Sequence, residues 1–241
     1  MIIYGINPVI EALRGGRVRE VRVAVRSSER HQQLLALARE AGVPVRTIAS
    51  DEVERESKGG VHQGVVATVD ATKEYTIDEL ARGTDGPPLI VVLDGIEDPH
   101  NLGAILRTVD AAGAHGVVIQ NRRSAALAGV AAKASAGALS HVRIAEVVNI
   151  ARAVEELKGL GVWSVGLAGE SETRYDSVDM TGPTAIVVGA EGTGLRRLVR
   201  ESCDFLASIP MRGHVSSLNV SVAAGVALFE AVRQRSGGVR R

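Results

Sequence analysis

The sequence predicts an α/β protein with two domains, a small α/β domain followed by a larger, mostly parallel sheet that helices cover on both faces. Three observations lead to this prediction. Near-continuous apolar strands alternate with helical patterns over residues 88–241, residues 18–26 alternate between apolar and other side chains, and residues 71–87 are rich in charge, glycine and proline. Buried parallel strands are apolar throughout, whereas half-buried strands alternate. We therefore expect domains over 1–70 and 88–241, joined by a linker over 71–87.

The first domain is expected to hold three strands and two helices. The alternation over 18–26 predicts a half-buried strand whose outer face is basic. The elements after it are predicted in this order: a helix ending at Gly42, a strand over 43–48, a short acidic helix over 51–56, the Gly59-Gly60 turn and a strand over 65–69. The linker that follows has room for about one helical turn.

The second domain is expected to alternate strictly between strand and helix. Its strands are predicted over 89–94, 116–120, 142–147, 162–167, 184–189 and 204–209. The last helix, over about 217–235, is apolar or small around its whole circumference from Val220 to Phe229. Such a helix is expected to be buried on all sides, either threaded into the fold or at a subunit interface.

Composition narrows the function classes. The 28 basic and 28 acidic side chains among 241 residues exclude the uniformly basic surface of a protein that coats nucleic acid without specificity. The one cysteine, Cys203, cannot form an intrachain disulfide, which fits a reducing, cytoplasmic location. No apolar run is long enough to cross a membrane, the first residues lack the pattern of a signal peptide, and the six histidines lack metal-ligand spacing. We therefore expect no membrane association, no export and no metal.

The first segment with chemical potential, LDGIEDPHNLGAILR, follows the first apolar strand of the second domain. Its turn is acidic and includes Asp94 and Asp98, so it would repel the phosphates that a glycine-rich dinucleotide turn binds. Asn101 is predicted at the helix N-cap, and Arg107 is predicted to face away from the buried stripe of that helix. A capping asparagine and a solvated arginine are the plain alternative.

Two further segments carry polar groups at expected strand ends. IVVGAEGTGL, over 186–195, is a glycine-rich turn that contains Glu191, and a carboxylate there suits a ligand with a cation or hydroxyl donors. IPMRGHVSSLN, over 209–219, places Ser217 and Asn219 at the start of the last helix. These groups either cap that helix or bind a polar ligand at the carboxyl edge of the sheet, and the glycine turn is either a site or a plain tight turn.

In this order, DPHNLGAILRT, VVGAEGTGL and IPMRGHVSSLNVSVAAGVALFEA closely resemble the three motifs of the SpoU (TrmH-type) branch of the SPOUT RNA methyltransferases. The resemblance covers essentially all of residues 88–241. The front end, from YGINPVIEAL to the VHQGVVATV segment at 61–69, is similar to a ribosomal-protein-like RNA-binding domain. In this family that domain precedes the catalytic domain of large-subunit rRNA guanosine 2′-O-methyltransferases.

The resemblance implies a fold, a reaction and a set of residues. It implies a C-terminal trefoil knot, a homodimer with the site near the subunit interface, and S-adenosylmethionine-dependent 2′-O-methylation of a guanosine ribose in 23S rRNA. Motif matching assigns the catalytic positions to Asn101, Arg107, Glu191, Ser217 and Asn219. It assigns the donor-binding positions to Gly189, Glu191, Gly192, Ile209, Met211, Leu218 and Asn219.

Physical chemistry favours direct, in-line transfer in which the protein mainly positions the ribose 2′-oxygen. A guanidinium only donates hydrogen bonds and has no site that accepts a proton, which argues against a role of Arg107 as general base. We therefore expect Arg107 to clamp a phosphate and stabilise the developing alkoxide, with Ser217 or Asn219 completing the hydrogen bonds.

Basic residues near the N-terminus predict the RNA-binding surface. They are Arg14, Arg17, Arg19, Arg22 and Arg26. A salt-bridged, solvated surface is the alternative explanation for these residues. Two other functions stay open for the whole chain, a tRNA 2′-O-methyltransferase of the same fold and a noncatalytic rRNA-binding assembly factor. A small-molecule nucleotide-binding protein is disfavoured by the acidic first turn.

Overall fold

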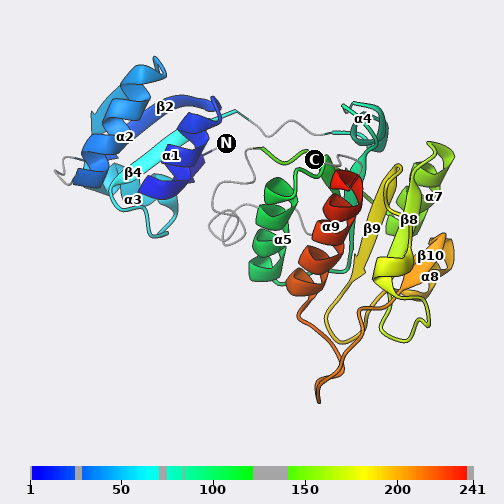
Figure 1. Ribbon diagram of the computed structural model, residues 1–241. Coiled ribbons are helices and arrows are strands. Elements are labelled where there is room, and N and C mark those ends of the chain that lie inside the picture. The colour runs from blue at the N-terminus through cyan, green and yellow to red at the C-terminus, as the bar shows by residue number, and fades with distance from the viewer. Residues whose placement is uncertain (1, 25–28, 71–74, 84, 122–140, 238–241) are drawn as a thin grey trace. The chain divides into compact units, whose positions relative to one another are not determined.

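The computed structural model describes residues 2–24, 29–70, 75–83, 85–121 and 141–237 (Figure 1). The chain divides into an N-terminal unit, Met1–Thr72, and a C-terminal unit, Lys73–Arg241. Each unit has hydrophobic clusters drawn only from its own residues.

The N-terminal unit is a four-stranded sheet, counted over its described residues, with helices on both faces. Its elements are β1 (Ile2–Tyr4), α1 (Ile6–Arg14), β2 (Val18–Ala24), α2 (Glu29–Glu40), β3 (Val45–Ile48), α3 (Ser50–Ser57) and β4 (Val65–Val69). The strand order is β1-β4-β2-β3, and only the β2/β3 pair is parallel. Alternate residues of β4 face opposite sides of the sheet, so Val65 packs with α1 and α2 while Val66 packs with α3.

The C-terminal unit is built on a parallel sheet in the order β10-β8-β9-β5-β6-β7, with every described neighbour pair parallel. Its strands are β5 (Leu89–Asp94), β6 (Gly116–Gln120), β7 (Ile144–Val147), β8 (Trp163–Leu167), β9 (Thr184–Gly189) and β10 (Phe205–Ala207). Its helices are α4 (Ile77–Arg82), α5 (Pro99–Ala111), α7 (Ile150–Gly159), the 3-10 turn η3 (Tyr175–Ser177), α8 (Arg197–Ser202) and α9 (Val220–Ser236). The apolar strands and the two-sided cover agree with the fold class expected from the sequence.

Two hydrophobic clusters cover the two faces of this sheet. Helices α5 and α9 lie side by side on one face, where Leu106 and Leu228 are fully buried (Figure 1). Helices α4, α7 and α8 cover the other face, where Leu80 and Leu157 are fully buried. The chain after β10 therefore leaves an edge strand and returns to α5 and to the inner strand β9.

Several local predictions differ from the structure. Residues 2–17 carry no predicted element, yet they form β1 and α1, whose residues Ile6, Val9, Ile10 and Leu13 are buried at helical spacing. Within residues 71–87, where about one helical turn is expected, the capping box of Thr76 and Glu79 starts the six-residue helix α4. The prediction that the last helix is buried on all sides is wrong for the single chain, since Val222 and Phe229 of α9 are both 50% exposed.

Candidate active site

The three segments singled out in the sequence meet at one set of side-chain amides and a carboxylate. Asn101 Nδ2 donates to Glu191 Oε2 at 3.4 Å, and Asn219 Nδ2 donates to Asn101 Oδ1 at 3.0 Å. Asn101, Glu191 and Asn219 thus form one hydrogen-bonded group, which we call the Asn101 cluster. Its two outer members lie 90 and 118 positions after Asn101 in the chain. The amide of Asn101 is the centre of this group because it uses its donor and its acceptor on different partners.

The start of α5 explains how Asn101 becomes available for this role. The predicted N-cap at Asn101 is wrong: Asp98 caps the helix, and its carboxylate accepts a hydrogen bond from the His100 N–H at 2.9 Å. Pro99 occupies the first turn, where its missing N–H has no cost. Asn101 therefore lies inside the first turn of the helix, buried at 9% exposure, with its side chain free for the cluster.

Asn219 has two functions at the start of α9. Its Oδ1 accepts hydrogen bonds from the Ser221 N–H at 3.0 Å and from Ser221 Oγ at 2.6 Å, so it caps the helix. Its Nδ2 remains for Asn101. The cap therefore fixes the orientation of the amide that enters the cluster.

Glu191 lies in a tight loop after β9. The loop folds back on the strand end, so a side-chain carbon added at Gly189 would lie 2.1 Å from the Gly194 carbonyl carbon. The Gly194 N–H donates to the Ala190 carbonyl at 2.8 Å, and Gly192 and Gly194 have φ values of 80° and 67°. These close approaches and left-handed angles require glycine. The loop thus presents Glu191 from a defined backbone.

Asp94, at the end of β5, fastens this loop to the sheet. Its carboxylate is fully buried and accepts hydrogen bonds from the Arg196 backbone N–H at 2.8 Å and from Arg196 Nε at 2.6 Å. Asp94 also lies opposite Gly189 in the β5/β9 register. Both ends of the loop that carries Glu191 are therefore held at the end of β5. Asp94, one of the acidic residues expected to repel a phosphate, thus has a structural role through its hydrogen bonds to Arg196.

Replacing Asp94 with asparagine is expected to lower the free energy of unfolding by about 1–3 kcal/mol, because the side chain loses its charge in the ion pair with Arg196 and one of the two oxygens that accept hydrogen bonds from Arg196. Donor affinity should fall with it, since the loop loses its anchor. Thermal unfolding and calorimetric titration with S-adenosylmethionine measure the two effects. Asp110→Asn, at an exposed position on α5, is the control and should change stability by less than about 0.5 kcal/mol. Wild-type stability and donor affinity in Asp94→Asn would show that the loop needs no anchor.

The structure leaves two of the motif-matched catalytic residues outside the cluster. Arg107 is exposed on α5, as its helical position predicts, and its side chain makes no hydrogen bond or ion pair with any residue that the structure describes. It lies six residues after Asn101, about 9 Å further along the helix axis and on a different side of it. Ser217 is exposed in the segment before α9. Both side chains are open to a bound substrate.

The remaining donor-binding candidates are glycines with open space beside their backbone and apolar residues with partly exposed side chains. A side-chain carbon added at Gly192 or Gly194 would meet no atom within 4 Å. Ile209, Met211 and Leu218 are partly exposed in the segment between β10 and α9, which extends away from the sheet in Figure 1. Glu191, in the glycine loop after β9, is exposed and offers a carboxylate to a cationic or hydroxyl-bearing ligand. These groups fit a ligand such as S-adenosylmethionine, which combines apolar, cationic and hydroxyl parts.

Cys203 does not take part in this chemistry. It is the C-cap of α8 and packs partly buried against the second-face cluster. Burial raises the pKa of its thiol to about 12, so the reactive thiolate is scarce at neutral pH. No group of three or more histidine, cysteine or acidic side chains is placed to hold a metal ion in the described ranges.

The arginines near the N-terminus are largely engaged with neighbouring acids. Arg14 Nη1 lies 2.8 Å from Glu11 Oε1, and Arg19 pairs with Asp70. Arg22 is mostly buried, and its Nη1 lies 2.9 Å from Glu56 Oε1 while its Nη2 donates to Thr68. Arg17 is partly buried, and Arg26 lies outside the described residues. Carboxylates thus offset part of the positive charge expected on this surface.

Comparisons with known proteins fit this arrangement. The SpoU rRNA Methylase family model matches residues 88–229, which hold all of the Asn101 cluster. The chain belongs to the SpoU rRNA methylase family. A second family model, RNA 2′-O ribose methyltransferase substrate binding, matches residues 2–75. The two models match separate parts of the chain, which correspond to the two units of the structure.

Curated relatives and solved structures extend the comparison over the whole chain. A relative from Pseudomonas putida named 23S rRNA (guanosine-2′-O-)-methyltransferase RlmB is 49% identical, covering 97% of this chain and 96% of the relative. One of the same name from Ralstonia nicotianae is 51% identical over 88% of this chain and 86% of its own length. The SpoU methyltransferase AviRb from Streptomyces viridochromogenes, solved with its cofactor AdoMet (S-adenosylmethionine), is 27% identical with a TM-score of 0.80 over 99% of this chain and 91% of that one.

Proposed function

We propose that the protein transfers the methyl group of S-adenosylmethionine to the ribose 2′-oxygen of a guanosine in 23S rRNA. The observation that carries this proposal is the Asn101 cluster, in which three segments of a SpoU rRNA methylase meet through hydrogen bonds of 3.0 and 3.4 Å. The names of relatives that are 49% and 51% identical support the rRNA substrate and the guanosine. The relatives thus support the rRNA substrate and the guanosine, and the geometry of the Asn101 cluster supports the proposed reacting site.

The donor is proposed to lie against the glycine loop and the segment after β10. The residues that would hold it are Gly189, Glu191, Gly192, Ile209, Met211, Leu218 and Asn219. The sulfonium of S-adenosylmethionine supplies an electrophilic methyl group. The chain's own residues then have to hold a ribose 2′-hydroxyl in line with that group and exclude competing orientations, because alignment accounts for much of the rate.

The residues proposed to act on the RNA are the exposed Arg107 and Ser217, together with the Asn101 cluster. A guanidinium keeps its proton at neutral pH, so Arg107 serves as a clamp on a phosphate and as a positive charge beside the developing alkoxide. Ser217 or the Asn219 amide completes the hydrogen bonds to the 2′-oxygen. As the 2′-oxygen bonds to the methyl carbon, the bond from that carbon to sulfur breaks, the 2′-hydroxyl proton passes to solvent water and S-adenosylhomocysteine leaves. The partner-free state of Arg107 among the described residues supports this role.

Domain roles and assembly are part of the same proposal. Residues 1–70 are assigned to RNA substrate binding, with contributions from Arg14, Arg17, Arg19, Arg22 and Arg26, residues 71–87 to a linker, and residues 88–241 to a methyltransferase domain with a trefoil knot. The return of α9 from the edge of the sheet to α5 supports the knot. The 50% exposure of Val222 and Phe229 on α9 supports a homodimer that covers them.

The cellular setting is proposed from the same relatives. None of the helices in the described ranges is long and apolar enough to cross a bilayer. A 23S rRNA substrate requires access to ribosomal RNA, so we propose a cytoplasmic enzyme. A tRNA substrate is the second candidate, because an Aquifex aeolicus TrmH/SpoU tRNA modifying enzyme is 34% identical with a TM-score of 0.59, although it covers only 67% of this chain.

Calorimetric titration with S-adenosylmethionine tests the donor part of the proposal. A methyltransferase should bind the donor stoichiometrically and should then transfer tritium-labelled methyl groups to unmodified 23S rRNA in preference to unmodified tRNA. Preference for tRNA would establish the second candidate. A protein that binds no donor would be the noncatalytic rRNA-binding factor that the sequence also allows.

A further inference from the structure

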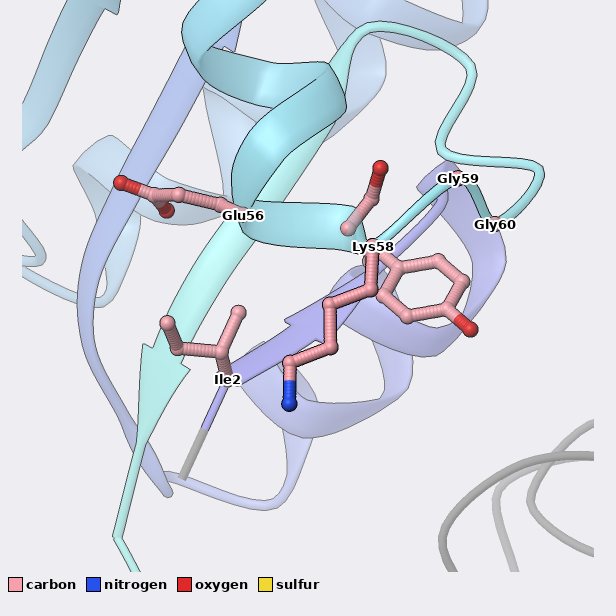
Figure 2. Close-up of a pocket in the computed structure, with 7 residues that line it drawn as sticks. Ile2, Glu56, Lys58, Gly59 and Gly60 are labelled. Carbon is pink, nitrogen blue, oxygen red and sulfur yellow. The ribbon is translucent and has the colours of Figure 1, made fainter.

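The N-terminal unit contains a cavity of about 530 Å³. Its lining includes none of the residues assigned to donor binding or catalysis. It is formed where the end of α3 and the following turn meet β1, and Figure 2 shows it in close-up. Ile2 and Tyr4 supply apolar and aromatic walls, and Lys58 is the one cationic side chain that lines it. Its volume lies within the range of small-ligand sites.

Lys58 keeps an uncompensated positive charge at this cavity. It is exposed, and its ammonium has no carboxylate partner among the residues described here. Glu56, the one acidic residue of the lining, is engaged by Arg22 Nη1 at 2.9 Å. In Figure 2 the Glu56 side chain points away from the Lys58 ammonium. The cavity therefore offers a cation to an anionic ligand, in contrast to the paired arginines of the same unit.

Lys58 occupies a backbone conformation in which glycine would be more stable than lysine. Lys58 is the C-cap of α3 and has φ 51° and ψ 41°, the left-handed region where glycine is the usual residue. The glycines come immediately after it, at positions 59 and 60. A lysine held in this conformation is strained, and such strain is found where a side chain has a function.

Gly60 shapes the aromatic wall. A side-chain carbon added there would lie 2.4 Å from Tyr4 Cε2 and 2.6 Å from the Tyr4 hydroxyl, so the ring occupies its position only beside a glycine. Ile2, across the same cavity, is 45% exposed although it is a large apolar residue. An apolar wall next to a free cation matches the two parts of a nucleotide, a base and its phosphate.

We propose that this cavity binds a single nucleotide of the RNA substrate, with the base against Tyr4 and Ile2 and a phosphate at Lys58. The inference rests on the proposed function and deepens it, since it assigns one nucleotide contact to a defined place on the N-terminal unit. None of the residues that line the cavity is assigned to donor binding or to methyl transfer. The contact therefore sets RNA affinity and leaves donor binding unchanged.

The test compares RNA affinity in full-length variants. Lys58→Gly removes the ammonium and also relieves the left-handed strain, so a loss of affinity in this variant cannot come from a loss of stability. Filter binding to an unmodified 23S rRNA transcript should show about tenfold weaker affinity, and the slope of log K against log salt should fall by about 0.7, the value for one phosphate contact to a single strand. Donor affinity, measured by calorimetry, should stay at the wild-type value.

Two further variants separate the cation from the wall and from general charge. Tyr4→Leu should weaken RNA binding without changing the salt slope, because the base loses its aromatic partner and the phosphate contact remains. Arg39→Gln removes an exposed positive charge of α2 that does not line the cavity, and it should change RNA affinity by less than about twofold. Melting curves for each variant establish that it is folded.

The outcomes test the nucleotide site separately from the proposed methyltransferase function. Wild-type RNA affinity and salt slope in Lys58→Gly would overturn the nucleotide site, whatever the enzyme methylates. A drop in Arg39→Gln as large as in Lys58→Gly would also overturn it, because the effect would then be general electrostatics. Failure of the wild-type protein to methylate 23S rRNA would overturn the proposed function. The binding measurement would still show whether the cavity binds a nucleotide of the RNA.

Discussion

Replacing Asn101 with alanine is expected to lower the rate of methyl transfer by about a hundredfold. The amide joins Glu191 to Asn219, so truncation releases both partners at once. The loss of one positioned hydrogen-bond donor in an enzyme site typically costs a factor of about 10²–10³. Single-turnover transfer of tritium-labelled methyl groups to a 23S rRNA transcript measures the rate without a contribution from product release.

The cluster also predicts how the effects of two substitutions combine. Asn219→Ala should reduce the rate to a similar extent, and the double variant should be about as slow as either single one, because groups that act as a unit are not additive. Asn149→Ala is the matched control, since it removes another capping amide, the N-cap of α7. That control should lose about 1 kcal/mol of stability and keep its rate. Additive losses in the double variant would mean that the two asparagines act separately.

Exchanging Arg107 for lysine is expected to lower turnover by about tenfold to a hundredfold while donor affinity stays the same. Lysine retains the positive charge but cannot make the paired hydrogen bonds that a guanidinium gives a phosphate. The exposed position on α5 means that the substitution should leave the fold intact. Steady-state kinetics at saturating donor, with RNA varied, measures the effect.

Two results would change the assignment of Arg107. Wild-type turnover in Arg107→Lys would exclude the bidentate clamp. A loss confined to KM for RNA, with unchanged turnover at saturation, would make Arg107 a binding residue with no role at the reacting atoms. A loss in turnover is the result that the clamp and alkoxide roles require.

The parallel sheet could be predicted because its strands are long apolar runs separated by helical patterns. β5, β6 and β9 begin and end at the predicted residues, and β7, β8 and β10 differ by a few residues. α1 was open to prediction as well, since Ile6, Val9, Ile10 and Leu13 recur at helical spacing, but β1 has only three residues and no periodicity of its own.

The site could be predicted only in part. The motifs identify Asn101, Glu191 and Asn219, but their hydrogen bonds depend on how β5, β9 and β10 are ordered in the sheet, which the sequence does not specify. The choice of Asp98 over Asn101 as N-cap depends on Pro99, which fits the first turn that follows Asp98. The link from Asp94 to Arg196 spans 102 residues and has no local signal.

The N-terminal surface is less positive than the sequence predicts because several of its arginines form ion pairs. A run of arginines indicates positive charge in the sequence, but Glu11, Asp70 and Glu56 reach these arginines from other positions in the fold. The partner of a surface charge depends on strand order and register, so it appears only in the folded chain. Lys58, in a segment with little basic character, retains its free charge for the same reason.

A map of 2′-O-methylation on 23S rRNA from a strain that lacks this gene decides whether the protein methylates a guanosine of that RNA. We expect that one guanosine loses its methyl group, that the wild-type gene restores it, and that a gene encoding Asn101→Ala does not. A deletion strain with the complete wild-type pattern of 2′-O-methylated guanosines would show that the protein does not methylate 23S rRNA in the cell.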